Sequence, residues 1–229
     1  MKSFKKQIWN KFCEKNNVIK QSVPLFATDK NLKVSIKEIG KTAKRSVLTR
    51  SVAMENFLLH EVEKVQNDHR NGGGIFDGII YIMFWEENGS VIPLYVGKAE
   101  KYGKNNGNLS ANLIGLKGDK GKFCRWGDNY AYHIGDLSAV TLPGHPEKKQ
   151  NPKYHKWSQK IFIESPSAEP RLGKEVMFWA KAWGNAEIGI WEEFGPTRLT
   201  FLEYLLIGVA SSIFEDDLLN EEGKNRGAS

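Results

Sequence analysis

The sequence predicts an α+β protein in which a small central, mainly antiparallel β-sheet is flanked by helices and preceded by an N-terminal helical segment. Short apolar runs rich in Ile and aromatic residues and bounded by turn residues are typical of strands, as in Gly78 to Trp85 and Val91 to Gly97. Apolar residues at three- and four-residue spacing are typical of helices, as in Ser51 to Gln66. We also expect a helix from Thr197 to Phe214.

Positive charge is concentrated near the N-terminus. Residues 1–50 contain 13 Lys and Arg against 3 Asp and Glu, although the net charge of the whole chain is only +6. The glycine run at 71–74 breaks regular structure, because glycine loses the most conformational freedom on folding. We therefore expect residues 1–70 to be a basic, mainly helical segment and residues 71–229 a second domain with inserted loops. Such a basic arm is typical of a nucleic-acid binder, and a solvated tail is the alternative.

The two expected strands are joined by Glu87-Asn88-Gly89, which predicts a hairpin. A two-residue Asn88-Gly89 turn places Tyr81 and Tyr95 on opposite faces of the sheet. A three-residue loop instead places the two side chains directly opposite each other on one face. Pro93 cannot donate to the ladder, so it predicts a bulge or an outward edge.

The remaining elements are less sharply defined by the sequence. We expect a short helix at 109–113, a strand at 130–137 and an exposed loop at 143–153. The segments 157–164 and 176–183 suit either a strand or a helix. The two cysteines, Cys13 and Cys124, show no disulfide or metal spacing, and no signal peptide or membrane-length apolar run is present. These features predict a soluble cytoplasmic protein with no membrane partner.

Gly78-Ile79-Ile80-Tyr81, followed across the hairpin by Tyr95-Val96-Gly97-Lys98, resembles the two halves of the signature of the GIY-YIG endonucleases. The chain departs from the pattern in an extra Ile before the first Tyr and a Val in the second triplet. The resemblance is clearest from Gly78 to Ser138 and leaves residues 1–70 unaccounted for. It implies a metal-dependent endonuclease that hydrolyses DNA phosphodiester bonds, of a restriction or phage-like stand-alone type.

The resemblance also implies roles for individual residues. Tyr81 would act as general base or orient the attacking water, and Tyr95 would hold the phosphate or the water. A tyrosine is a poor base at neutral pH unless a cation lowers its pKa, and Lys98 is well placed to supply that cation. Arg125, the one Arg between Gly78 and Glu169, would hold the scissile phosphate through its planar guanidinium; a surface ion pair is the alternative. His133 is a further candidate, against the alternative of a structural histidine.

Glu203 is the one charged residue between Arg198 and Glu215, within an otherwise apolar helix. A buried carboxylate needs hydrogen bonds, a cation or a metal. The resemblance assigns it Mg²⁺, with Mn²⁺ able to substitute, and Asn220 as a possible second ligand. The alternative is a capping box with Thr200.

Two rival functions stay open at this point. One is a nuclease with a metal held by His145, Asn151 and His155. The other is a DNA-binding module on the same fold without catalysis. For the endonuclease we expect double-stranded DNA as partner and a homodimer, because cutting both strands requires two sites. Residues 1–70, with Lys41, Lys44, Arg45 and Arg50, would then grip the DNA backbone or form the dimer.

Overall fold

The computed structural model describes residues 2–41, 44–103 and 107–224. The chain forms two compact units, each made of segments that are separate in the sequence. Unit 1 comprises Met1–Val23, Phe57–Ile114 and Met177–Ser229, and unit 2 comprises Pro24–Asn56 and Gly115–Val176. The expected α+β class is confirmed, whereas the compact units do not follow the boundary expected at residue 70.

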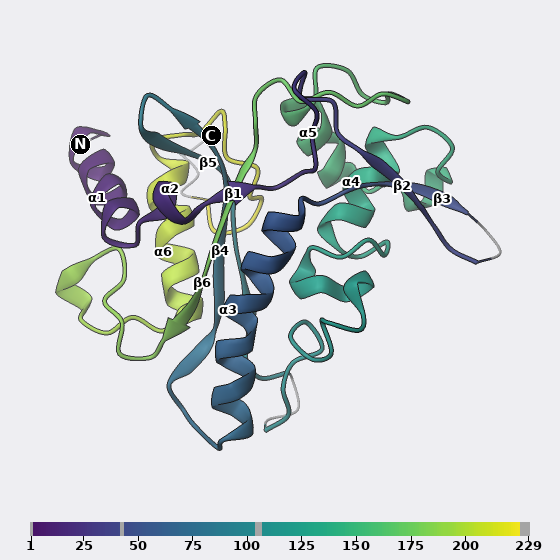
Figure 1. Ribbon diagram of the computed structural model, residues 1–229. Helices are drawn as coiled ribbons and strands as arrows, with labels where there is room; N and C mark the ends of the chain where they lie inside the picture. The colour runs from purple at the N-terminus through teal and green to yellow at the C-terminus, as the bar shows by residue number, and fades with distance from the viewer. Residues whose placement is uncertain (1, 42–43, 104–106, 225–229) are drawn as a thin grey trace. The chain divides into compact units, whose positions relative to one another are not determined.

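Unit 1 is built on an antiparallel sheet whose strand order is β1-β6-β4-β5 (Figure 1). Its central strand β4 pairs antiparallel with both β5 and β6. The strands are β1 (Val23–Pro24), β4 (Phe76–Glu87), β5 (Ser90–Glu100) and β6 (Met177–Gly184). The helices are α1 (Lys2–Lys15), α2 (Val18–Gln21), the 3-10 helix η3 (Glu192–Phe194) and α6 (Leu199–Ser211), together with most of α3 (Val52–Arg70).

The β4–β5 hairpin changes register along its length, so neither the two-residue nor the three-residue loop alone predicts all of its residue pairs. Asn88 and Gly89 both have positive φ, 49° and 71°, and form a two-residue turn in which Glu87 pairs with Ser90. A bulge then shifts the register by one residue, because Phe84 pairs with Pro93 but Met83 pairs with Tyr95. The shift confirms the bulge expected at Pro93.

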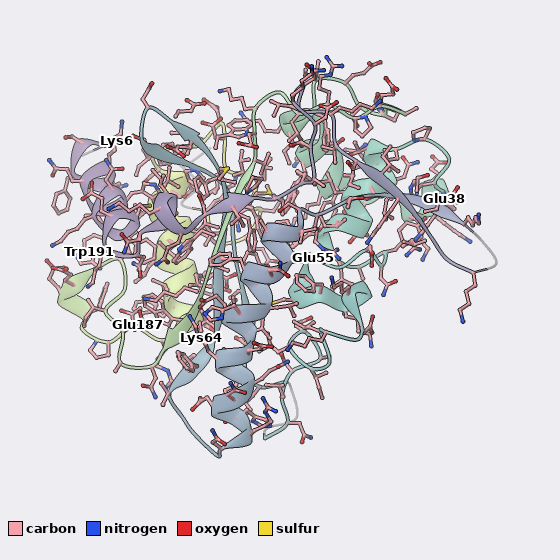
Figure 2. All side chains as sticks on the ribbon, viewed as in Figure 1. Lys6, Glu38, Glu55, Lys64, Glu187 and Trp191 are labelled. Atoms are coloured by element: carbon pink, nitrogen blue, oxygen red, sulfur yellow. The ribbon has the colours of Figure 1, made fainter. Side chains whose placement is uncertain are left out.

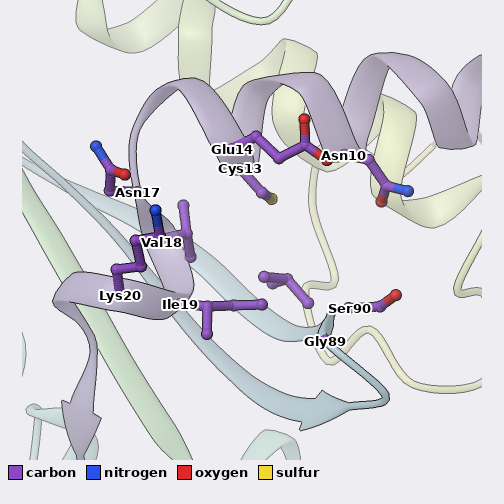
Figure 3. Close-up of a pocket in the computed structure, with 10 residues that line it drawn as sticks. Asn10, Cys13, Glu14, Asn17, Val18, Ile19, Lys20, Gly89 and Ser90 are labelled. Atoms are coloured by element: carbon purple, nitrogen blue, oxygen red, sulfur yellow. The ribbon is translucent and has the colours of Figure 1, made fainter.

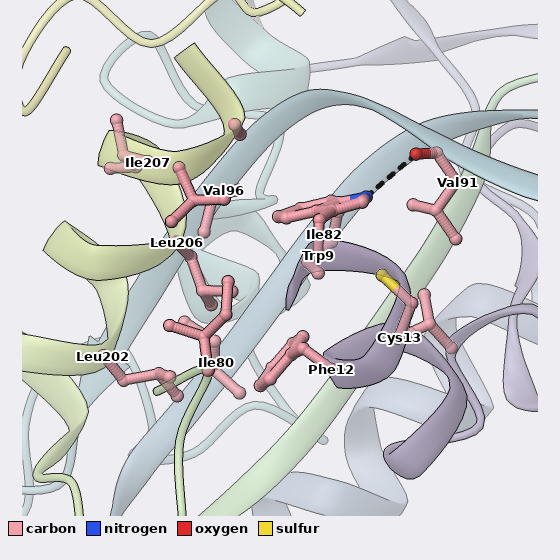
Figure 4. Close-up of a cluster of buried hydrophobic side chains, with 14 of the residues drawn as sticks. Trp9, Phe12, Cys13, Ile80, Ile82, Val91, Val96, Leu202, Leu206 and Ile207 are labelled. Atoms are coloured by element: carbon pink, nitrogen blue, oxygen red, sulfur yellow. Dashed lines mark hydrogen bonds between the residues drawn. The ribbon is translucent and has the colours of Figure 1, made fainter. Parts of the chain in front are cut away.

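One face of the sheet packs against α1 and α6 (Figure 4). Leu202 and Leu206 of α6 meet Ile80 and Ile82 of β4 in this core cluster. The Trp9 indole of α1 donates a hydrogen bond of 3.0 Å to the Val91 carbonyl of β5. Alternate residues of β4 therefore face this core, as the period of two requires, whereas the bulge changes the facing residues along β5.

Unit 2 contains a two-stranded ribbon and a pair of helices. Its elements are β2 (Ile36–Ile39), β3 (Arg45–Leu48), η1 (Lys120–Arg125), α4 (His133–Thr141), η2 (Glu147–Lys149) and α5 (Pro152–Ile161). Helix α4 packs against both β3 and α5. The Leu48 amide donates to Ser138 Oγ at 2.9 Å, which ties the ribbon to α4.

Several local expectations are corrected. Residues 133–141 form helix α4, whereas a strand was expected at 130–137. Because every residue of α4 is buried, its polar and apolar residues do not alternate with the helical period that would identify a helix in the sequence. The segment 109–113 is not a helix, because Leu109 forms an isolated bridge with Tyr102 and residues 111–118 form turns. Residues 23–48 contain three strands inside the segment expected to be mainly helical. The two ambiguous segments become α5 and β6. No helix in the described ranges is long and apolar enough to cross a membrane.

Candidate functional site

A polar network lies where β5 meets the start of α6. Lys98 and Glu100 are two residues apart on β5, so both side chains face α6. The Lys98 ammonium contacts the Glu100 carboxylate, donates to Thr200 Oγ1 at 2.9 Å and lies 3.9 Å from Glu203 Oε2. Thr200 in turn donates to Glu100 Oε1 at 2.8 Å. One cation is therefore shared by two carboxylates and a hydroxyl.

Glu203 is the electrostatically unusual member of this network. Its side chain is 17% exposed. Burial raises the pKa of Glu203 to about 7, and the negative charges of Glu100 and Glu222 add to that rise, while Lys98 opposes it. A carboxyl group with such a pKa can accept and release a proton near neutral pH.

The N-terminus of α6 is capped from β4 and not by a capping box. Asp77 accepts the Leu199 amide at 3.2 Å and holds the Arg198 guanidinium through two contacts of 2.6 Å. Thr200 lies inside the helix and bonds to Glu100, so it is not the N-cap residue. A hollow of about 310 Å³ beside this cap is lined by, among others, Asp77, Glu100, Arg198 and Thr200.

Tyr81 and Tyr95 share one face of the sheet, with ring centroids 6.3 Å apart. That face is opposite to Lys98 and Glu203, because Tyr81 lies between Ile80 and Ile82, which both face α6. The Tyr81 ring stacks on Phe178 at 6.0 Å, and the side chain is only 2% exposed. The structure thus brings the two tyrosines together and Lys98 with Glu203 together, but it separates the two pairs.

Arg125 and His133 belong to unit 2. Arg125 is exposed, and its guanidinium lies 5.5 Å from the centroid of Tyr132. His133 is buried against Trp126 and Trp157, and its Nδ1 lies 2.7 Å from the Tyr154 hydroxyl. Burial lowers the pKa of His133 well below its usual value. A neutral, enclosed imidazole of this kind supports the structural alternative for His133.

The basic residues expected to grip DNA are not all available for that role. Arg50 is buried, donates to the Trp126 carbonyl at 2.7 Å and pairs at 2.9 Å with Glu55 in the first turn of α3 (Figure 2). Lys44 pairs with Glu38 at 3.1 Å. Lys41 is exposed. Arg50 therefore stabilises unit 2.

Other predicted ligands have structural partners. Asn220 donates to and accepts from the Val96 backbone at 2.8 and 3.0 Å, so it extends the edge of β5. The two ring nitrogens of His145 bond to the Tyr130 hydroxyl and the Ser46 carbonyl. Asn151 caps α5 by accepting the Lys153 amide. His155 is exposed on α5, but without the other two groups the His-metal alternative loses its ligand set.

A second cavity of about 330 Å³ lies between α1, α2 and the β4–β5 turn (Figure 3). Cys13 lines it, and burial raises the pKa of this thiol far above neutral pH. Burial likewise raises the pKa of Cys124 to about 12. Neither cysteine is therefore a thiolate nucleophile at neutral pH.

The described ranges contain no group of three or more His, Cys, Asp or Glu side chains suited to hold a metal. Comparison with known proteins gives no match to a family model, a curated protein or a solved structure. The resemblance to the GIY-YIG endonucleases consequently stays a prediction from the hairpin residues alone.

Sequence reasoning missed Asp77, Glu100 and Arg198, and it considered Thr200 only as a helix cap. One signal was present, since Lys98-Ala99-Glu100 places two charges on one face of a strand. Asp77 had no such signal, because its link to Arg198 spans 121 residues of sequence.

Proposed function

We propose that the chain hydrolyses DNA phosphodiester bonds at the Lys98–Glu203 pair, as an endonuclease of the GIY-YIG type. The observation that carries this proposal is the Glu203 carboxyl group, whose pKa of about 7 makes it a proton acceptor beside a cation. Lys98 lies on β5, the strand that resembles the second half of the signature, and Glu203 lies on α6 beside it. A general base beside a cation is the combination that attack of water on a phosphodiester requires.

In the proposed reaction, Glu203 takes a proton from a water molecule whose oxygen forms a bond to phosphorus. The bond between phosphorus and the leaving deoxyribose oxygen breaks, and that oxygen is protonated by solvent. Lys98 offsets the negative charge that builds on the phosphate. Tyr81 is buried on the other face, so we assign Tyr81 and Tyr95 to packing of the hairpin and place the base at Glu203.

Mg²⁺ is compatible with this site, although the protein offers few ligands. Glu203 and Glu100 would hold the ion, since Mg²⁺ is commonly bound by one or two carboxylates with water and phosphate at its other positions. Bound there, Mg²⁺ or Mn²⁺ would neutralise charge on the phosphate. In the structure, the Lys98 ammonium contacts both of these carboxylates, those of Glu100 and Glu203.

The proposed substrate is double-stranded DNA, and a homodimer would supply the two sites for cleavage of both strands. Sequence-specific cleavage of the restriction type is part of the proposal. Two buried thiols without a disulfide fit the reducing cytoplasm. Arg125, which belongs to unit 2, would contact a phosphate of the DNA backbone.

Cleavage of supercoiled plasmid with Mg²⁺ or Mn²⁺ tests the proposal. We expect nicked or linear plasmid with the wild type and with Glu215→Gln, an exposed acidic control just after α6. Glu203→Gln should give no product. Absence of cleavage by the wild type with either metal would overturn the proposal.

A DNA-binding module without catalysis is the second candidate. The burial of Tyr81 and the lack of a three-ligand metal group in the described ranges favour it. This candidate predicts retained, salt-dependent DNA binding and no plasmid cleavage.

A further inference from the structure

The two units carry opposite net charge. Unit 2 contains 18 Lys and Arg against 10 Asp and Glu, a balance of +8. Unit 1 contains the remaining 15 Lys and Arg against 17 Asp and Glu, a balance of −2. The excess of positive charge therefore belongs to unit 2. Part of it comes from the lysines of residues 148–160, which are far from the N-terminus in the sequence. A polyanion would be attracted to unit 2.

Several of these cations lie over aromatic rings. Tyr130 has the Arg45 guanidinium 4.2 Å from its ring centroid and the Lys149 ammonium at 5.2 Å. Arg125 lies over Tyr132, with its guanidinium 5.5 Å from the ring centroid. Tyr130 and Tyr132 are both half-buried, whereas Trp157, the ring beneath Lys153, is fully buried and only packs against the lysine stem. Rings interleaved with cations are the chemistry that proteins use to hold a nucleic-acid strand, because phosphates meet the cations while sugars and bases meet the rings.

Asp136, in the first turn of α4, is the acidic group inside this cationic region. It is only 8% exposed. The charges acting on it are, in decreasing order, Arg125, Lys153 and Lys149. Arg125, Lys149 and Lys153 come from three different elements, η1, η2 and α5, and each acts electrostatically on this carboxyl group.

The backbone that presents Arg125 is strained. Cys124 and Arg125 are consecutive non-glycine residues with positive φ, 44° and 69°. Such residues are uncommon and persist where the surroundings hold them, often at functional sites. Arg50 holds this turn through its bond to the Trp126 carbonyl and its contact with the Phe123 ring at 5.0 Å.

We propose that Arg125, Lys149 and Lys153 form a binding site for the phosphate backbone of a nucleic-acid strand on unit 2, flanked by Tyr130 and Tyr132. Asp136 lies within this site and weakens it by repulsion. This inference rests on the proposed function in one respect only, namely that the bound nucleic acid is DNA. It assigns DNA contact to this surface, and not to the N-terminal segment as a whole.

The test is the binding of a fluorescein-labelled 20-base-pair DNA duplex, measured by anisotropy in EDTA so that cleavage does not interfere. We expect Arg125→Ala, Lys149→Ala and Lys153→Ala each to raise Kd several-fold and to lower the slope of log Kd against log salt by about 1. Lys30→Ala, an exposed lysine of the same unit, should change Kd less than twofold. Asp136→Asn should lower Kd, a gain that misfolding cannot produce.

Unlabelled DNA and poly-L-glutamate are then compared as competitors at equal charge concentration. Displacement by DNA at much lower concentration supports a nucleic-acid site, and equal displacement overturns it. Unchanged Kd in the Lys149→Ala/Lys153→Ala double variant, or an unchanged Kd in Asp136→Asn, would also overturn the site. Plasmid cleavage is scored separately, so a protein that binds DNA without cutting it contradicts the proposed function and leaves this site standing.

Discussion

Glu203 Oε2 on α6 lies 3.9 Å from Lys98 Nζ on β5, and burial raises the pKa of that carboxyl group to about 7. A carboxylate in direct ion-pair contact usually has a lowered pKa. Here burial and the neighbouring acids outweigh the single cation that Glu203 shares with Glu100. The pair therefore retains a proton acceptor that titrates at neutral pH.

Replacing Glu203 with glutamine keeps the size of the side chain and removes its basicity. We expect plasmid cleavage to fall by about 10²- to 10⁴-fold, the usual contribution of a positioned acid or base. DNA binding in EDTA should change less than twofold. Cleavage at the wild-type rate would remove Glu203 from the proposed site.

The same substitution should raise stability at alkaline pH. Because the pKa of Glu203 is raised on folding, the folded chain holds the proton more tightly than the unfolded chain. Its free energy of unfolding therefore falls as pH rises from the ordinary pKa of 4.5 to about 7. Urea unfolding should show Glu203→Gln more stable than wild type by about 1–3 kcal/mol at pH 8 and nearly equal at pH 4.5. An advantage independent of pH would contradict this titration.

Gly97 is required by the ring of Tyr81. A Cβ atom at Gly97 would lie 2.6 Å from two ring carbons and the hydroxyl oxygen of Tyr81, which is too close for any side chain. We expect Gly97→Ala to destabilise the protein by about 1–3 kcal/mol, the cost of overpacking a core. Gly208 in α6 is the control, since nothing lies within 4 Å of its added Cβ. Gly208→Ala should stabilise by about 0.5–1 kcal/mol, and equal effects of the two changes on the melting temperature would refute the packing argument.

The hairpin and α6 could be predicted because their signals are local. Short apolar runs bounded by turn residues, an Asn-Gly turn and an apolar helix define them within short windows. The shared face of Tyr81 and Tyr95 was one of two alternatives, and the bulge after Pro93 decided it. Proline indicated a bulge but not which way the register would shift.

The rest depends on contacts between distant segments. Helix α4 is buried all round, so no polar face marks its period. Unit 2 combines residues 24–56 with 115–176, which composition alone does not reveal. Tyr81 lies between Ile80 and Ile82 in β4, and only the packing of α6 against those two residues shows that Tyr81 faces away from Glu203.

The buried pair of Lys101 and Asp68 should act as one unit. Lys101 Nζ lies 2.7 Å from both Asp68 Oδ2 and the Gly73 carbonyl, and both side chains are almost fully buried. Asp68→Asn leaves the ammonium without its counter-charge, so we expect a loss of about 3–5 kcal/mol in urea unfolding. The double variant Asp68→Asn/Lys101→Met should recover part of that loss. Strictly additive losses would show that the two groups are not coupled.

The Tyr81→Phe variant distinguishes two roles of Tyr81: a buried packing residue, as its position in the sheet indicates, and the general base that the family resemblance implies. If Tyr81 acts as general base, removing its hydroxyl should lower cleavage by about 10²-fold or more. The ring is buried on the face opposite to Glu203, so we expect Tyr81→Phe to retain at least half of the wild-type cleavage rate. Rates are compared with those of Glu203→Gln at equal folded fraction, checked by circular dichroism. A hundredfold loss in a fully folded Tyr81→Phe protein would return the base to Tyr81 and would require the tyrosine face of the sheet to become accessible to substrate.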